Sequence, residues 1–206
     1  MCYSPEVSAG TFLFVTAVSA YLFTRNKGLD RPIAGILFVV GLMQLIEWIL
    51  WLNLDCNWIN KLLSRLIHVY LVLQPVVINF LVWHYNAGWA SGYKEIGLLS
   101  LVLLPIVAWR TRHLQTKCVS VGPTGNLVWA GIPNQAWDSS LMRAIYYPSL
   151  FYPILTLKNT LFSAVYGFFG IGSLLVYWKT SEKSWPSLWC HFVNALSVLA
   201  IIRPGP

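Results

Sequence analysis

The stretch QLIEWILW carries side chains that could handle protons or bind an ion inside an otherwise apolar segment. Gln44, Glu47 and Trp51 follow one another at helical spacing, so a helix here would carry them on one face. Glu47 is the only acid well inside any long apolar run. An ionised carboxyl group in hydrocarbon costs about 2.5 kcal/mol or more, so such residues usually face a bundle interior or a cavity. We therefore predict a polar pocket whose floor is Gln44 and Glu47.

Two other apolar segments carry residues that could join this pocket. His68 lies about two turns inside the third apolar segment, and His191 lies on one stripe with Asn194 in the last. At 1.5 Å per residue, Glu47, His68 and His191 lie about 8 to 10 Å below the same membrane surface. Equal depth makes a contact between these three side chains possible if their helices adjoin. The alternative is that Glu47 and His68 only form hydrogen bonds between helices, and that Cys190 is a small buried apolar residue.

The first eight residues, MCYSPEVS, are polar for so apolar a chain. Ser4-Pro5-Glu6 predicts a helix start, because serine caps a helix, proline suits its first turn and an acid favours its positive end. This helix start leaves Cys2 and Tyr3 unexplained. We predict that both fold across the bundle and close the pocket at the level of Trp189 and Cys190.

The elements that must position these residues are membrane helices. Of the 206 residues, 57% are hydrophobic and 10% are charged, which excludes a single soluble domain. Apolar runs long enough to cross about 30 Å of hydrocarbon predict an all-α membrane protein, a single domain over residues 1–206 with about seven transmembrane helices. The predicted spans are residues 8–24, 33–53, 62–83, 95–109, 142–157, 161–178 and 186–202.

Residues 110–140, between the fourth and fifth predicted spans, form the only sizeable loop. Within it, KCVSV and NLVWAG flank the turn sequence GPTG, which predicts a small β-hairpin that covers one membrane surface as a lid. Because seven spans alternate in direction, the amino terminus and this loop fall on the same side of the membrane. We call that side face A and the opposite side face B.

The four cysteines all fall at face A, namely Cys2, Cys56, Cys118 and Cys190. They allow three pairings and would suit an oxidising compartment. Eight Lys and Arg residues lie toward face A and six toward face B, a weak indication that face A is cytosolic. The two signals disagree, so the orientation stays open. The formal charge of +7 fits anionic lipid headgroups, whereas no basic cluster is dense enough to bind nucleic acid.

The motifs MCYSPEVS, QLIEWILW and SLWCHFVNALSVLAI resemble those of an uncharacterised family of small polytopic membrane proteins. Its members open with Met-Cys-x-Ser-Pro, carry a Gln/Glu/Trp stripe in the second span and end with a helix that contains Trp-Cys. GLMQLIEWILW is also similar to a stretch of the alkaline ceramidases, seven-span zinc hydrolases, although the supporting histidines are missing here. The resemblance to the uncharacterised family implies that the motif positions are Cys2, Ser4, Pro5, Gln44, Glu47, Trp51, Trp189 and Cys190.

Three functions fit these residues. The first is a channel or carrier for a proton, an ion or a small solute, in which Glu47 is the titrating group. The second is a structural membrane subunit or scaffold, whose polar residues only fix the helix packing. The third is a membrane-embedded, metal-dependent lipid hydrolase with zinc on Glu47, His68 and His191. The first is favoured, and the sequence leaves open whether a lipid binds and whether chains oligomerise.

Overall fold

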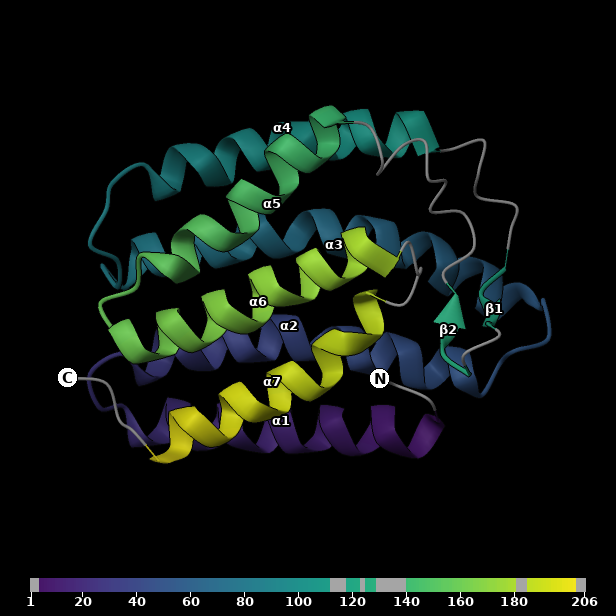
Figure 1. Ribbon diagram of the computed structural model, residues 1–206, viewed down its shortest axis with the longest axis horizontal. Coiled ribbons are helices and arrows are strands. Elements are labelled where there is room, and N and C mark those ends of the chain that lie inside the picture. The colour runs from purple at the N-terminus through teal and green to yellow at the C-terminus, as the bar shows by residue number, and fades with distance from the viewer. Residues whose placement is uncertain (1–3, 112–117, 123–124, 129–139, 181–184, 203–206) are drawn as a thin grey trace.

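The computed structural model describes residues 4–111, 118–122, 125–128, 140–180 and 185–202. Seven helices make up most of this part of the chain and confirm the predicted all-α bundle with a small hairpin (Figure 1). Each predicted span corresponds to one helix. The elements are α1 (Pro5–Arg25), α2 (Asp30–Trp51), α3 (Trp58–His84), α4 (Tyr93–Thr111), β1 (Ser120–Val121), β2 (Leu127–Val128), α5 (Ser140–Leu155), α6 (Thr160–Thr180) and α7 (Trp185–Ile202).

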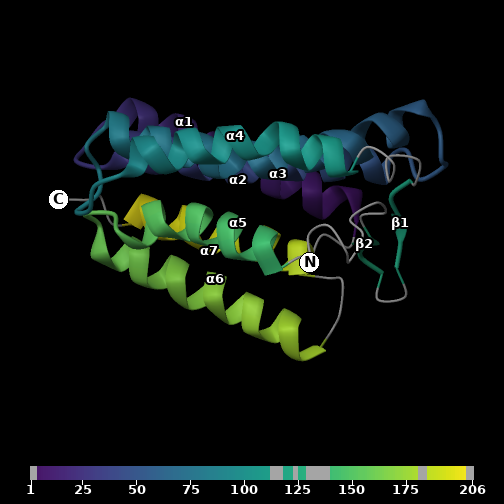
Figure 2. The ribbon, with the colours of Figure 1, turned by 90° about the horizontal axis from the view of Figure 1, so that it is seen from above.

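The helices form two layers, which Figure 2 shows edge-on. α1, α2, α3 and α4 lie side by side in chain order in one layer, and α5, α6 and α7 form the other. α7 packs against α1 and α2, while α5 packs against α3 and α4. Successive helices run in opposite directions, so the connections alternate between the two ends of the bundle. Face A is the end with the hairpin, at the right of Figure 1, and face B carries the α1–α2, α3–α4 and α5–α6 connections.

The composition of the helices fits an integral membrane protein. α1, α2 and α3 are each long and apolar enough to cross a membrane. Within the described residues, α6 and α7 contribute the shorter apolar stretches Thr160–Gly172 and Phe192–Ile202. Large apolar side chains also cover the outside of the bundle, as at Phe168, which is 76% exposed. Such a surface is unfavourable in water, whereas lipid tails would cover it at no cost.

Local signals set the ends of α1. Ser4 is the N-cap, and its hydroxyl group accepts a hydrogen bond from the backbone N–H of Val7 at 3.3 Å. Pro5 occupies the first turn, and Glu6 lies near the positive end of the helix dipole. At the other end, Asn26 has a φ of 48°, the left-handed conformation that commonly ends a helix. The helix start predicted from Ser4-Pro5-Glu6 is therefore present.

Prolines interrupt the helical hydrogen bonds of α3 and α5, and one amide side chain bridges the two helices there. Pro153 has no N–H, so the carbonyl of Ser149, one turn earlier, lacks its helical partner. The Nδ2 atom of Asn79 donates to that carbonyl at 2.8 Å and to the carbonyl of Pro75 at 2.7 Å. Asn79 is fully buried. This pair of bonds supports a helical α5 despite its prolines and joins the two layers.

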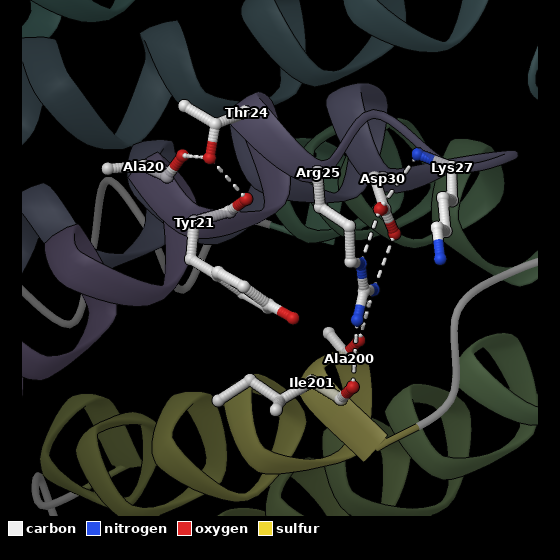
Figure 3. Close-up of polar contacts among 8 residues, drawn as sticks. All are labelled: Ala20, Tyr21, Thr24, Arg25, Lys27, Asp30, Ala200 and Ile201. Carbon is white, nitrogen blue, oxygen red and sulfur yellow. Dashed lines mark hydrogen bonds and ion pairs between the residues drawn. The ribbon is translucent and has the colours of Figure 1, made fainter.

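Arg25 joins three elements at face B (Figure 3). Its Nε and Nη2 atoms donate to the two carboxyl oxygens of Asp30, each at 2.7 Å. Its Nη1 and Nη2 atoms also donate to the carbonyls of Ile201 and Ala200, both at 2.9 Å. Those carbonyls belong to the last turn of α7, where the helix has no N–H to offer them. One guanidinium group therefore ties the α1–α2 turn to the end of α7.

The predicted hairpin lies at face A beside the first turns of α3 (Figure 1). β1 and β2 are antiparallel, with Ser120 opposite Val128 and Val121 opposite Leu127. Gly125, in the turn between them, has a φ of 77°, which glycine adopts without strain. The two short runs flanking GPTG thus pair in the way that the sequence predicts.

Candidate functional site

α2 lies against three other helices, α1, α3 and α7, and carries the residues predicted to form the floor of a pocket. Gln44 is 2% exposed and Glu47 is fully buried, so both lie inside the bundle. Each of these two side chains is engaged in a polar interaction. Trp51, one turn nearer face A, is half-buried. The Gln44–Glu47 stripe therefore faces other helices and not lipid.

α1 brings two hydroxyl groups to the level of Glu47. A Cβ atom on Gly41 of α2 would lie 2.7 Å from Cγ1 of Val15, so the two helices approach closely at this point. On α1, Thr11 lies about one helical turn from Val15 toward face A, and Ser8 lies about two turns from Val15 in the same direction. Glu47 also lies about two turns from the contact, on α2. Ser8 and Thr11 are both buried and therefore face the interior of the bundle.

α7 reaches the same level through an amide. The Nδ2 atom of Asn194 donates to the hydroxyl oxygen of Thr11 at 3.0 Å. This hydrogen bond joins α7 to α1. Trp189, Cys190 and His191 belong to α7 and lie about 5 to 8 Å nearer face A along its axis. The side chains of these three lie outside the described residues, so their predicted places in the pocket stay predictions.

α3 contributes His68, which is 8% exposed. The hydroxyl group of Tyr70 on α3 donates to the carbonyl of Val39 on α2 and so joins the two helices. His68 lies about half a helical turn from Tyr70 along α3, on the side toward face A. Gln44 lies about one and a half turns from Val39 along α2, in the same direction. His68 therefore belongs to the same half of the bundle as Gln44. The hydroxyl group of Ser64, one turn above, instead accepts a hydrogen bond from the base of the hairpin.

Four buried polar atoms in this region have no hydrogen-bond partner among the described residues, and each comes from a different helix. An unsatisfied buried polar atom costs about 1 to 3 kcal/mol, so a folded protein contains few of them. The atoms are Oγ of Ser8, Nε1 of Trp51, Nδ1 of His68 and Oδ1 of Asn194. Ser8, Trp51 and His68 lie in the face A halves of their helices, and Asn194 bonds Thr11 of α1. Water or a small polar ligand is the kind of partner that such atoms take. We call Ser8, Thr11, Gln44, Glu47, Trp51, His68 and Asn194 the polar cluster.

The side chains of the polar cluster can bind a proton, a hard cation or water. Within the part of the chain that the structure describes, no three His, Cys, Asp or Glu side chains are placed to hold a metal ion. The predicted zinc ligands Glu47, His68 and His191 include one side chain outside this part, so that set stays a prediction. The closure by Cys2 and Tyr3 likewise falls outside the described residues. The cluster offers mainly oxygen atoms and one imidazole, which hydrogen-bond water and bind hard cations.

Sequence reasoning missed the contribution of α1 to this site. Ser8 and Thr11 were treated only as part of an apolar span, although their spacing held a signal. Together with Val15, Val18, Ser19 and Leu22 they form one buried helical stripe, with Ser8 and Thr11 at its face A end. This spacing of Ser8 and Thr11 on the buried stripe was the signal that could have found them.

A disulfide and one buried amide fasten the hairpin to α3. Cys56 and Cys118 are bonded, with their Cα atoms 5.5 Å apart. Beside this bond, the Nδ2 atom of Asn60 donates to the carbonyl of Val119 at 3.0 Å, and its Oδ1 atom accepts from the N–H of Val119 at 2.9 Å. The side-chain amide thus pairs with Val119 much as a neighbouring strand would. Of the pairings that the sequence left open, the structure has the one between Cys56 and Cys118.

We predict a second disulfide, between Cys2 and Cys190. With Cys56 and Cys118 bonded, these are the two cysteines that remain. Cys2 comes two residues before the cap of α1, and Cys190 comes about one turn before Asn194, which bonds α1. The helices α1 and α7 lie against each other and both begin at face A, where the oxidant that formed the first bond can also accept the two electrons of a second. Peptide mass spectrometry without reduction should find the two linked, and finding both as free thiols would contradict the prediction.

A comparison with known protein families, curated proteins and solved structures finds no match to this chain. The resemblances drawn from its motifs therefore stay predictions. Any functional conclusion has to come from the geometry of the polar cluster and from the chemistry of its side chains.

Proposed function

We propose that the protein is a membrane channel or carrier for a proton, a cation or a small polar solute, with Glu47 as the group that binds it. The observation that carries this proposal is the set of four unsatisfied polar atoms on α1, α2, α3 and α7, together with the buried carboxyl group of Glu47 on α2. Water or a transported species would satisfy those atoms. A carboxyl group in a membrane-embedded bundle commonly serves as such a binding group.

The energetic cost of the cluster argues for use and against mere packing. Four unsatisfied polar atoms cost about 4 to 12 kcal/mol if nothing binds them, which is as large as the whole stability of many domains. Leucine or alanine at these positions would fill the interior without that cost. The cluster also holds one carboxyl group and no lysine or arginine, so it favours a positive species over an anion.

Flux measurements on proteoliposomes test this function. We expect the purified protein to dissipate a pH gradient, or a gradient of a monovalent cation, faster than protein-free liposomes. Glu47→Gln keeps the size of the side chain but removes the charge and the exchangeable carboxyl proton. This variant should return the rate to that of protein-free liposomes. Glu95→Gln, the same change at an exposed acid on α4, should leave the rate unchanged.

The outcomes separate the other two functions. A scaffold predicts no flux in any variant, together with a loss of stability in Glu47→Gln, which unfolding in detergent would reveal. A lipid hydrolase predicts stoichiometric metal in the purified protein and release of lipid products in a liposome without a gradient. If Glu47→Gln conducts as fast as the wild type, the proposed role of this carboxyl group is wrong.

A further inference from the structure

The two ends of the bundle carry different chemistry, which bears on how the protein sits in its membrane. Face A holds the bond between Cys56 and Cys118. Cys56 is exposed and Cys118 is half-buried, so cellular reductants could reach this bond from that side. Disulfides of this kind persist in secretory and extracellular compartments and are reduced in the cytosol. Face A is therefore suited to the side away from the cytosol.

Face B carries a rim of cations that lie over aromatic rings. An aromatic ring at a membrane surface is half in hydrocarbon, and a cation above it is held at the depth of the lipid headgroups. Three of these rings are themselves well exposed, with Trp89 at 71%, Phe23 at 53% and Trp83 at 48%. We call the following pairs the basic rim: Arg31 over Phe23 at 5.2 Å, Lys94 over Trp83 at 5.4 Å and Lys158 over Trp89 at 5.9 Å.

Backbone hydrogen bonds hold part of this rim in place. The loop after α3 and the loop before α6 pair with each other at face B. The N–H of Trp89 donates to the carbonyl of Thr156, and the N–H of Lys158 donates to the carbonyl of Ala87, both at 2.8 Å. The ammonium group of Lys158 donates to the carbonyl of Asn86 at 2.8 Å. The cation and its indole are therefore fixed side by side on two different loops.

Few acids counter this charge. Among the described residues, face B has two acids, Asp30 and Glu95. Asp30 is 2% exposed and already bonded to Arg25, so its charge is used within the protein. Glu95 alone remains exposed against the basic rim and Lys27. The described part of face B thus presents a net positive surface at headgroup depth.

We propose that face B docks on the anionic phospholipid headgroups of the cytosolic leaflet, while the disulfide and hairpin of face A lie in an oxidising compartment. Anionic lipids concentrate in cytosolic leaflets, so the basic rim and the disulfide assign the same orientation from opposite ends of the molecule. The count of eight basic residues against six favours the reverse orientation, but by only two residues. A disulfide exposed to cytosolic reductants would be lost, and an excess of two basic residues does not prevent that loss.

Labelling in sealed microsomes, whose outer surface is cytosolic, tests the orientation. Ser91→Cys places a thiol on the exposed part of the face B loop, and Lys61→Cys places one at face A. A membrane-impermeant maleimide should label Ser91→Cys in intact microsomes and Lys61→Cys only after detergent, with the wild-type chain as background. Labelling of Lys61→Cys without detergent would overturn the proposed orientation.

Lipid retention by the purified protein tests the docking surface separately. In detergent micelles that contain equal amounts of phosphatidylserine and phosphatidylcholine, native mass spectrometry counts the lipids that stay bound. Lys94→Gln/Lys158→Gln should retain phosphatidylserine about tenfold less than the wild type, because two headgroup contacts lose their charge. Lys61→Gln/Arg65→Gln, two exposed cations at face A, should retain it as the wild type does. Equal loss in both double variants, or no loss in either, would overturn the assignment of this surface.

Discussion

Replacing Arg25 with methionine is expected to lower the free energy of unfolding by about 3 to 5 kcal/mol. The guanidinium group is 10% exposed and the carboxyl group of Asp30 is 2% exposed, so the change leaves a buried charge without its partner. The backbone N–H of Lys27, which donates to Asp30 at 2.9 Å, would remain, but it cannot replace a bidentate ion pair. The carbonyls of Ala200 and Ile201 would also lose their donor.

Denaturant titration in detergent micelles measures this effect, and hydrogen exchange in the last turn of α7 shows where it acts. Arg31→Met is the matched control, because Arg31 is exposed and lies near the same turn. It should change the unfolding free energy by less than about 1 kcal/mol. Arg25→Met/Asp30→Asn should lose less than the two single variants together, because the orphaned charge is gone. If Arg25→Met unfolds as Arg31→Met does, Arg25 does not hold α7.

Asn60→Asp is expected to destabilise the protein by about 3 kcal/mol or more and to loosen the hairpin. The Nδ2 atom of Asn60 donates to the carbonyls of Asn53 and Val119, and the side chain is fully buried. Aspartate has the same shape but no donor, so a carboxylate oxygen would face two carbonyl oxygens away from water. Hydrogen exchange should therefore rise in residues 118–122 and 125–128, even though the disulfide still tethers them.

Asn57→Asp provides the control for Asn60→Asp on the same helix. The side chain of Asn57 caps α3 by accepting from the N–H of Asn60 at 2.9 Å, and aspartate caps a helix equally well. The loss of its bond to Asn53, at 3.1 Å, is offset because a negative charge is favourable at this end of the helix dipole. The change should stay within about 1 kcal/mol. Similar unfolding of both variants would mean that Asn60 is not the anchor of the hairpin.

The helices and the hairpin could be read from the sequence because their signals are local. An apolar run long enough to span a membrane can be recognised from its own residues alone. The segment with Pro148 and Pro153 therefore reads as a span despite its two prolines. The start of α1 follows from Ser4-Pro5-Glu6, and the hairpin follows from two short β-prone runs around GPTG. These features depend on residues within a few positions of one another, so no knowledge of neighbouring helices is needed.

Part of the candidate site could be predicted for the same reason. The spacing of Gln44 and Glu47 fixes their common face on α2, and the cost of a charge in lipid predicts that this face is buried. The helices that pack against this face of α2 could not be predicted, because an apolar helix can pack against any other apolar helix. Ser8 and Thr11 were missed on α1, while Asn194 was placed correctly in a polar stripe but without its bond to Thr11.

The sequence by itself determined the number of helices in the described part of the chain, their approximate positions and the end of the bundle near which the described polar residues fall. The tertiary structure alone decided which residues meet. It joins Arg25 to carbonyls about 175 positions away, Asn79 to the carbonyl that Pro153 leaves open, and Cys56 to Cys118 among three pairings. The physical reason is that membrane helices form independently from their own hydrogen bonds, whereas their association depends on the close packing and polar contacts of distant side chains.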